Sequence, residues 1–145
     1  MNFLVDSAEM LTDKTWRQIH PHLAGGFVCA LEGPLGSGKT TLVQGLAGKL
    51  GVKDHITSPT FNLRKSYRIA RPVKGARELQ HIDLYRLEKA TGFDEMELED
   101  WLSDKKSITF IEWAENIQEA EKSADLVIKI KAVGDRLRKV ELIWK

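Results

Sequence analysis

The chain of 145 residues has 22 Lys and Arg against 21 Asp and Glu, a net charge of +1, and 42% hydrophobic residues. This length and composition are typical of one globular domain, residues 1–145, and the near-zero charge gives no reason to expect direct binding to nucleic acid or to an acidic membrane. A single cysteine, Cys29, excludes an internal disulfide and fits a reducing compartment. Because the sequence shows no signal peptide and no apolar run near the ~20 residues of a membrane helix, we expect a soluble cytoplasmic protein.

The first part of the chain alternates between predicted strands and helices. Residues 2–5 predict a short strand, and Asp6 and Ser7 can cap a helix that runs to about His20. The near-continuous apolar run 27–31 predicts a strand in a sheet that is covered on both faces. This order of elements indicates an α/β domain.

A glycine-rich turn leads from this strand into a predicted helix over residues 39–50. The expected apolar face of that helix consists of Leu42, Val43, Leu46, Ala47 and Leu50. Gly45 and Gly48 each weaken it by ~1 kcal/mol relative to alanine, so tertiary packing must hold it, and Gly51 can cap its end.

The rest of the chain predicts further strands with short helices between them. The expected elements are an irregular connection at 57–61, a hairpin or loop over the basic stretch 64–78, strands at 79–84 and 107–111, a short amphipathic helix around 98–102, a short helix over 115–122, and an antiparallel hairpin of 126–132 with 138–143. Together these elements predict a central mixed sheet, mostly parallel in its core with antiparallel additions, flanked by helices.

The strongest motif lies in the glycine-rich turn, where residues 33–40 read Gly-Pro-Leu-Gly-Ser-Gly-Lys-Thr and fit G-x-x-x-x-G-K-[ST]. A buried strand precedes it and a helix follows, which is the context of a phosphate-binding P-loop. Backbone amides at the start of a helix can surround phosphates as an anion nest, and Lys39 can reach the β and γ phosphates. The Thr40 hydroxyl is of the type that binds Mg²⁺. The fold class expected is therefore a P-loop NTPase-like three-layer α/β fold.

Two acidic residues are candidates for the second ligand that a P-loop needs to orient Mg²⁺ and water. Glu112 ends the apolar strand 107–111, and Asp83 lies near the end of the strand 79–84. Acids at the carboxyl edge of a parallel sheet lie where α/β proteins bind their ligands. An acid at a strand end can also be a cap or a salt-bridge partner, and the sequence does not separate the roles of these two.

Four segments together resemble the TsaE family, the P-loop ATPases of bacterial tRNA threonylcarbamoyladenosine biosynthesis. They are the P-loop at 33–41, Ser-Pro-Thr-Phe at 58–61, His-Ile-Asp-Leu-Tyr-Arg-Leu at 81–87, and Glu-Trp at 112–113. The order and rough spacing match the family over nearly the whole chain. Two departures are the Ala-Glu pair that follows Trp113, where relatives often have proline and an acid, and a basic stretch that is longer than usual.

The resemblance implies catalytic roles for Lys39, Asp83 and Glu112, and metal binding by Thr40, Glu112 and Asp83. Ser58 and Thr60 would lie on a switch-like loop that senses the γ-phosphate. The nucleotide-binding residues that the motif and the resemblance imply are Gly33, Leu35, Gly36, Ser37, Gly38, Lys39, Thr40, Thr41, Trp113, Ser7, Ala8 and Arg136.

The resemblance also implies a function, with ATP or ADP and Mg²⁺ as cofactors. In this family the ATPase is an accessory subunit of the two-protein complex, built from TsaB and TsaD family proteins, that transfers threonylcarbamoyl to tRNA adenosine. Contact with tRNA would come only through that complex. We expect slow hydrolysis by the isolated chain, because no arginine finger is identifiable; Arg64, Arg68, Arg86 or a partner's arginine could serve.

Other readings remain open. A small-metabolite or nucleotide kinase shares the P-loop, but no acceptor-site signature is evident, and a GTP switch would need N-K-x-D and D-x-x-G motifs that are absent. Trp113 could be a core aromatic, His81 an ordinary strand histidine, and Cys29 a small buried hydrophobe. The basic residues of 64–77 could form a solvated face or an electrostatic surface for a tRNA-bearing complex.

Overall fold

The computed structural model of the protein describes residues 1–59, 63–87 and 95–145. Seven strands form one sheet in the order β1-β7-β6-β2-β5-β4-β3. The strands are β1 (Asn2–Val5), β2 (Val28–Glu32), β3 (Arg64–Val73), β4 (Ala76–Asp83), β5 (Ser107–Glu112), β6 (Leu126–Ala132) and β7 (Arg138–Trp144). The four central strands β6, β2, β5 and β4 are parallel, and β1, β7 and β3 are antiparallel additions. The prediction of a mixed sheet with a parallel core is confirmed.

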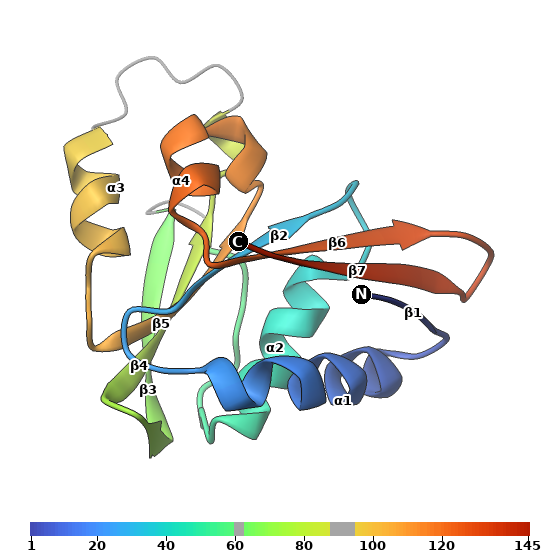
Figure 1. Cartoon of the computed structure of the whole chain (residues 1–145), viewed down its shortest axis with the longest axis horizontal. Helices are drawn as coiled ribbons and strands as arrows, with labels where there is room; N and C mark the ends of the chain where they lie inside the picture. The colour runs from blue at the N-terminus through green and yellow to red at the C-terminus, as the bar shows by residue number, and fades with distance from the viewer. Residues whose placement is uncertain (60–62, 88–94) are drawn as a thin grey trace.

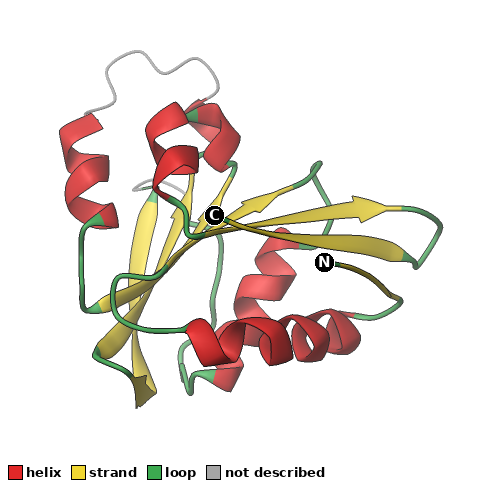
Figure 2. Cartoon of the chain, in the orientation of Figure 1, coloured by secondary structure: helices red, strands yellow, loops and turns green. Residues whose placement is uncertain are grey.

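Helices cover both faces of this sheet, so that the fold has three layers (Figure 1). The helices are α1 (Ala8–Ile19), α2 (Lys39–Lys49), α3 (Glu95–Leu102) and α4 (Gln118–Ser123), with short 3₁₀ turns η1 (His20–His22), η2 (Tyr85–Leu87) and η3 (Ala114–Asn116). Figure 2 shows α1 and α2 on one side of the strands and α3 and α4 on the other. None of the helices in the three described ranges has the length and apolarity that crossing a membrane requires.

The alternation of side chains along β2 explains why both faces are covered. Cys29 and Leu31 point into the larger core with α1 and α2, and Val28 and Ala30 point into the smaller core with α3 and α4. All four are buried, which is why the segment reads as a continuous apolar run rather than an alternating one. Burial also raises the pKa of the Cys29 thiol far above its usual range, so this residue behaves as a small hydrophobe.

Helix α1 begins as its sequence predicts and packs closely on α2. The Ser7 side chain caps the helix by accepting a hydrogen bond of 3.0 Å from the Met10 amide. Gly45 of α2 faces Thr12 of α1 so closely that a Cβ atom at residue 45 would lie 1.9 Å from the Thr12 hydroxyl. Gly45 therefore weakens the isolated helix but permits its close contact with α1.

The basic stretch forms a hairpin, one of the two forms its sequence allows. β3 and β4 are joined at the pair Val73↔Ala76 through Lys74 and Gly75, which have φ angles of 40° and 87°. Two consecutive residues at positive φ are typical of a type I′ turn, whose twist matches that of the strands. The second predicted hairpin, β6 with β7, is also present.

The helix predicted over residues 115–122 differs in the structure. The segment divides into η3 and α4, because Ile117 is extended at φ −131° and ψ 113° and cannot continue a helix. Ile117 is buried in the smaller core, so tertiary packing overrides the local helical preference.

Candidate functional site

The glycine-rich turn connects the end of β2 to the start of α2. Gly33, Gly36 and Gly38 have φ angles of 154°, 78° and 115°, which side chains other than glycine rarely adopt. At Gly33 a Cβ atom would also meet the Ile130 carbonyl oxygen at 2.4 Å. The three motif glycines are therefore needed for the path of the loop, which leaves its amides at the amino end of an eleven-residue helix.

Two hollows open on either side of this loop and share Gly36, Gly38 and Thr41. The first, about 370 Å³, is lined by Leu35, Gly36, Gly38, Lys39, Thr40, Thr41, Ser58, Asp83, Tyr85, Glu112 and Trp113. The second, about 330 Å³, contains Ser7, Ala8, Asp135, Arg136 and Arg138 beside the loop. The fold thus brings the predicted site residues together in two groups, with the acids and Lys39 in one and Ser7, Ala8 and Arg136 in the other. An extended ligand that lies along the loop would reach both.

Thr40 and Glu112 meet in the first hollow. The Thr40 hydroxyl lies 2.8 Å from each oxygen of the Glu112 carboxylate, although 72 residues separate them in sequence. Thr40 comes from the first turn of α2 and Glu112 from the end of β5, which pairs with β2. A hydroxyl and a carboxylate that converge in this way are the oxygen ligands that Mg²⁺ prefers, so these residues fit the metal that the motif implies.

Asp83 lies beside Glu112, because the two residues pair across β4 and β5. One oxygen of Asp83 accepts a hydrogen bond of 2.5 Å from the Ser58 hydroxyl, and the other accepts one of 3.0 Å from the Tyr85 amide. Ser58, a residue predicted for the switch-like loop, therefore contacts Asp83 directly. Thr60, the other residue predicted for this loop, lies outside the described residues.

Lys39 is directed back onto its own loop. Its Nζ atom donates to the carbonyl oxygens of Gly33 and Pro34 at 2.5 and 3.1 Å, and lies over the ring of Trp113. Burial lowers the pKa of Lys39, while the nearby charge of Glu112 opposes this shift. The Lys39 ammonium group therefore lies against the loop, where its partners are two neutral carbonyl groups and an aromatic ring.

Trp113 belongs to the rim of the site as well as to the core. It adopts a left-handed backbone conformation at φ 60°, which turns the chain sharply after Glu112. Its ring packs against the smaller core and against Tyr85, with 5.0 Å between the ring centroids. Both aromatic residues line the hollow that contains Lys39.

Residues that sequence reasoning left aside also belong to the site. His81 is completely buried, and its Nε2 atom lies 2.6 Å from Glu112 Oε2. Tyr85 lines the first hollow. The sequence signal for His81 and Tyr85 was that both lie in the 81–87 motif. The signal for His81 was ambiguous, because a histidine in a strand is most often an ordinary core residue.

An acidic group lies next to the loop, at the end of β2. The pKa of Glu32 is raised to about 7, most of all by burial and further by a hydrogen bond with Glu121 and by repulsion from Glu115 and Glu121. Lys129, 4.0 Å away, acts in the opposite direction. The pKa of Glu115 is also raised, mainly by burial. Glu32 is therefore partly protonated near neutral pH.

The arginines proposed as fingers are not among the residues that line the Lys39 hollow. Arg64 donates from Nε to the Gln80 side chain and lies over the ring of Trp101. In the described part of the chain, the arginines beside the loop are Arg136 and Arg138, and both line the second hollow.

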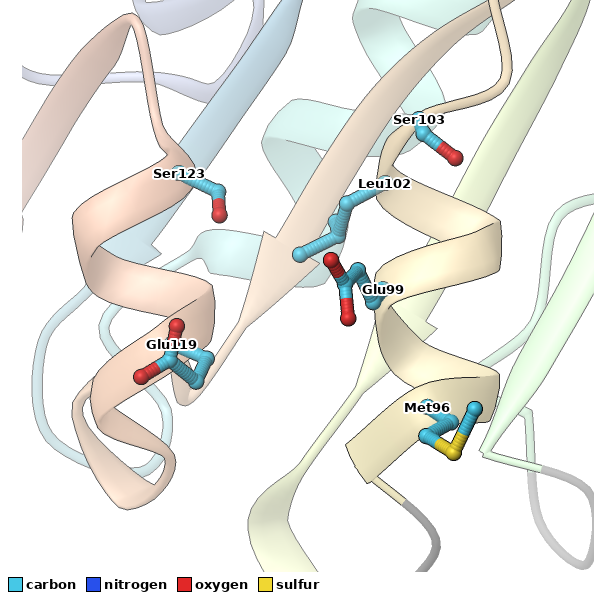
Figure 3. Close-up of a pocket in the computed structure, with 6 residues that line it drawn as sticks. All are labelled: Met96, Glu99, Leu102, Ser103, Glu119 and Ser123. Atoms are coloured by element: carbon cyan, nitrogen blue, oxygen red, sulfur yellow. The ribbon is translucent and has the colours of Figure 1, made fainter.

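A further hollow of about 380 Å³ lies between α3 and α4 (Figure 3). Its lining consists of Met96, Glu99, Leu102, Ser103, Glu119 and Ser123. None of these was a predicted site residue, and the hollow is separate from the two that flank the loop.

Comparisons with known proteins agree with this arrangement. The sequence pattern of the family described as "Threonylcarbamoyl adenosine biosynthesis protein TsaE" matches residues 6–140. A protein of Streptomyces coelicolor described as tRNA threonylcarbamoyladenosine biosynthesis protein TsaE is 40% identical, with 82% of this chain and 78% of the relative covered. Relatives with the same description in Bacillus subtilis and Haemophilus influenzae are 36% and 34% identical, covering 79% and 84% of this chain and 68% and 73% of their own lengths.

A solved structure is also similar. The crystal structure of Bacillus subtilis YdiB superposes with a TM-score of 0.66 at 28% identity, over 97% of this chain and 82% of that chain. The likeness therefore extends over almost the whole chain. By its sequence and its fold, this chain belongs to the TsaE family.

Proposed function

We propose that this chain is a Mg²⁺-dependent ATPase that acts as an accessory subunit in tRNA threonylcarbamoyladenosine biosynthesis. Membership of the family supports the pathway, and the meeting of Thr40 with Glu112 at the end of the P-loop is the observation that most supports the chemistry. The partners would be the TsaB and TsaD family proteins of the threonylcarbamoyl-transfer complex, with tRNA reached through that complex. The place of action would be the cytoplasm.

The first hollow would hold the β and γ phosphates of ATP, and the second the nucleoside. The amides of the loop and of the first turn of α2 would donate to phosphate oxygens. Lys39 would leave the carbonyls of Gly33 and Pro34 for the β and γ phosphates, since an anion is a stronger partner than a neutral carbonyl. Ser7, Ala8 and Arg136 would border the base or the ribose.

Thr40 and Glu112 would hold Mg²⁺, which neutralises charge that develops on the phosphate oxygens. Asp83 would orient the attacking water or a water of the metal's shell. Its carboxylate already has two donors, Ser58 and the Tyr85 amide, which fix its direction toward the hollow. The hydrolysis would be slow without partners, because no arginine among the described residues lines the Lys39 hollow.

The test is ATP hydrolysis by the purified chain, measured alone and with the TsaB and TsaD proteins, without a small acceptor. The proposal expects low activity alone and a rise on addition of the two proteins, both dependent on Mg²⁺ and both lost in Lys39→Ala. Binding of ATP without hydrolysis in either condition would overturn the ATPase assignment. A screen of small-metabolite and nucleotide acceptors would then test the kinase alternative.

A further inference from the structure

His81 has an environment that a packing role does not explain. Its side chain is completely buried in β4, and it is the buried partner of Glu112, which is only 3% exposed. His81 lies two residues before Asp83, the residue that pairs with Glu112 across β4 and β5. Because alternate side chains on a strand share a face, His81 lies on the same face as both acids.

The contact is with one defined oxygen of the carboxylate. His81 Nε2 lies 2.6 Å from Glu112 Oε2, and the Thr40 hydroxyl lies 2.8 Å from the same oxygen. A carboxylate without a proton only accepts hydrogen bonds, so the His81 proton belongs on Nε2. Two donors from different elements, β4 and α2, therefore fix the plane of a side chain that otherwise has several free torsions.

The other nitrogen of the ring has no such partner. His81 Nδ1 is buried and makes no hydrogen bond to any described residue. The apolar side chain of Leu79 fills the neighbouring place on the same face of the strand, and an apolar residue at position 81 would avoid this unpaired polar atom. The polar contact that His81 does make, through Nε2, is with Glu112.

We propose that His81 is a positioning residue that holds the Glu112 carboxylate in the orientation needed to bind the divalent cation of the nucleotide complex. This inference rests on the proposed function, since it assigns a role at the same site. His81 would not contact the metal or the nucleotide. Its effect would be on metal affinity, because partners behind a metal ligand typically contribute 10–100-fold.

The experiment compares three variants of His81. His81→Gln places an amide N–H near the position of Nε2, His81→Asn has the same amide on a shorter side chain that does not reach Glu112, and His81→Leu has no donor. Mn²⁺ affinity in the presence of ATP is measured by electron paramagnetic resonance, and ATP affinity is measured separately in EDTA. Thermal unfolding of each variant reports whether it is folded.

The expected result is a 10–100-fold loss of Mn²⁺ affinity in His81→Leu and His81→Asn, with ATP affinity in EDTA unchanged. His81→Gln should recover most of the metal affinity. If His81→Leu fails to fold, the comparison of Gln with Asn provides the same test. The inference would be overturned if the folded variants bound Mn²⁺ as tightly as the wild type. It would also be overturned if a variant lost ATP affinity in EDTA by the same factor as Mn²⁺ affinity. Wild-type protein that binds ATP without any effect of Mn²⁺ would overturn the proposed function itself.

Discussion

The Nζ atom of Lys39 lies 4.1 Å from the centroid of the Trp113 ring. Lysine over an aromatic face is a favourable contact of ~0.5–2 kcal/mol, and more when the pair is removed from water. This contact joins the P-loop to the turn that follows β5. A nucleotide that attracts Lys39 must therefore change the surroundings of Trp113.

The first prediction concerns fluorescence. ATP binding should change the tryptophan emission of the protein, because Lys39 moves from the ring toward the phosphates. Trp113→Phe should lose this change although Trp16, Trp101 and Trp144 remain. Titration of both proteins with ATP checks the prediction, and an equal change in Trp113→Phe would show that another tryptophan reports the binding.

The second prediction concerns the charge of Lys39. Lys39→Ala should lower ATP hydrolysis by about 100-fold or more, because the site loses the cation that stabilises negative charge on the phosphate oxygens in the transition state. The fold should survive, as checked by circular dichroism. Lys49→Ala is the matched control, since Lys49 lies in the same helix but pairs with Asp13 on the surface. Full hydrolysis by Lys39→Ala would contradict the P-loop assignment.

The third prediction separates two glycines of α2. Gly45→Ala should destabilise the protein by about 1–3 kcal/mol, because the new Cβ would overlap the Thr12 side chain. Gly48→Ala should stabilise it by about 0.5–1 kcal/mol, since nothing lies within 4 Å of its added Cβ and alanine favours the helix. Denaturant unfolding of both variants measures the difference, and shifts of the same sign would refute the close α1–α2 contact.

The fourth prediction concerns pH. The pKa of Glu32 is raised to about 7 from its ordinary value of 4.5, so the folded protein binds more protons than the unfolded chain between these pH values. The contribution of Glu32 to stability therefore falls as pH rises from about 4.5 to about 7, by roughly 1 kcal/mol after allowance for solvent screening. The groups that face it are Glu115, Glu121 and Lys129.

Glu32→Gln should remove this part of the pH dependence, because glutamine does not titrate. From pH 5 to pH 8, the unfolding free energy should then fall less, or rise more, than it does in the wild type. Glu32→Gln also removes the 4.0 Å contact with Lys129, which lowers stability at pH 8. This loss is small, because the lysine side chain is largely exposed. An unchanged pH profile in Glu32→Gln would contradict the raised pKa.

The fifth prediction concerns the second acid. Asp83→Asn should lower the hydrolysis rate by about 100-fold, because an amide cannot orient water as a carboxylate does. ATP affinity should change much less, since Asp83 is not part of the glycine-rich loop that is proposed to bind the phosphates. Ser58→Ala, which removes only the 2.5 Å hydrogen bond to Asp83, should have a smaller effect on rate. Equal losses of affinity and rate in Asp83→Asn would indicate a role in binding instead.

Most of the elements of this chain could be predicted from local pattern. The cap at Ser7, the buried run of β2 and the glycine-rich turn each depend on neighbouring residues, so the sequence predicts them well. The prediction of one continuous helix over 115–122 was wrong. Ile117 interrupts it because this side chain is buried in the core with α3 and α4, and the local sequence does not show that burial.

The sequence by itself determined the chemical groups available: a loop with Lys39 and Thr40, and acids at the ends of two strands. Only the tertiary structure decided which groups meet, because strand order and register bring Glu112 to Thr40 across 72 residues and place Asp83 beside it. The same register puts His81 against Glu112, a contact that local sequence could not distinguish from an ordinary core position. Pairings of this kind depend on long-range packing of the sheet, and no local preference encodes them.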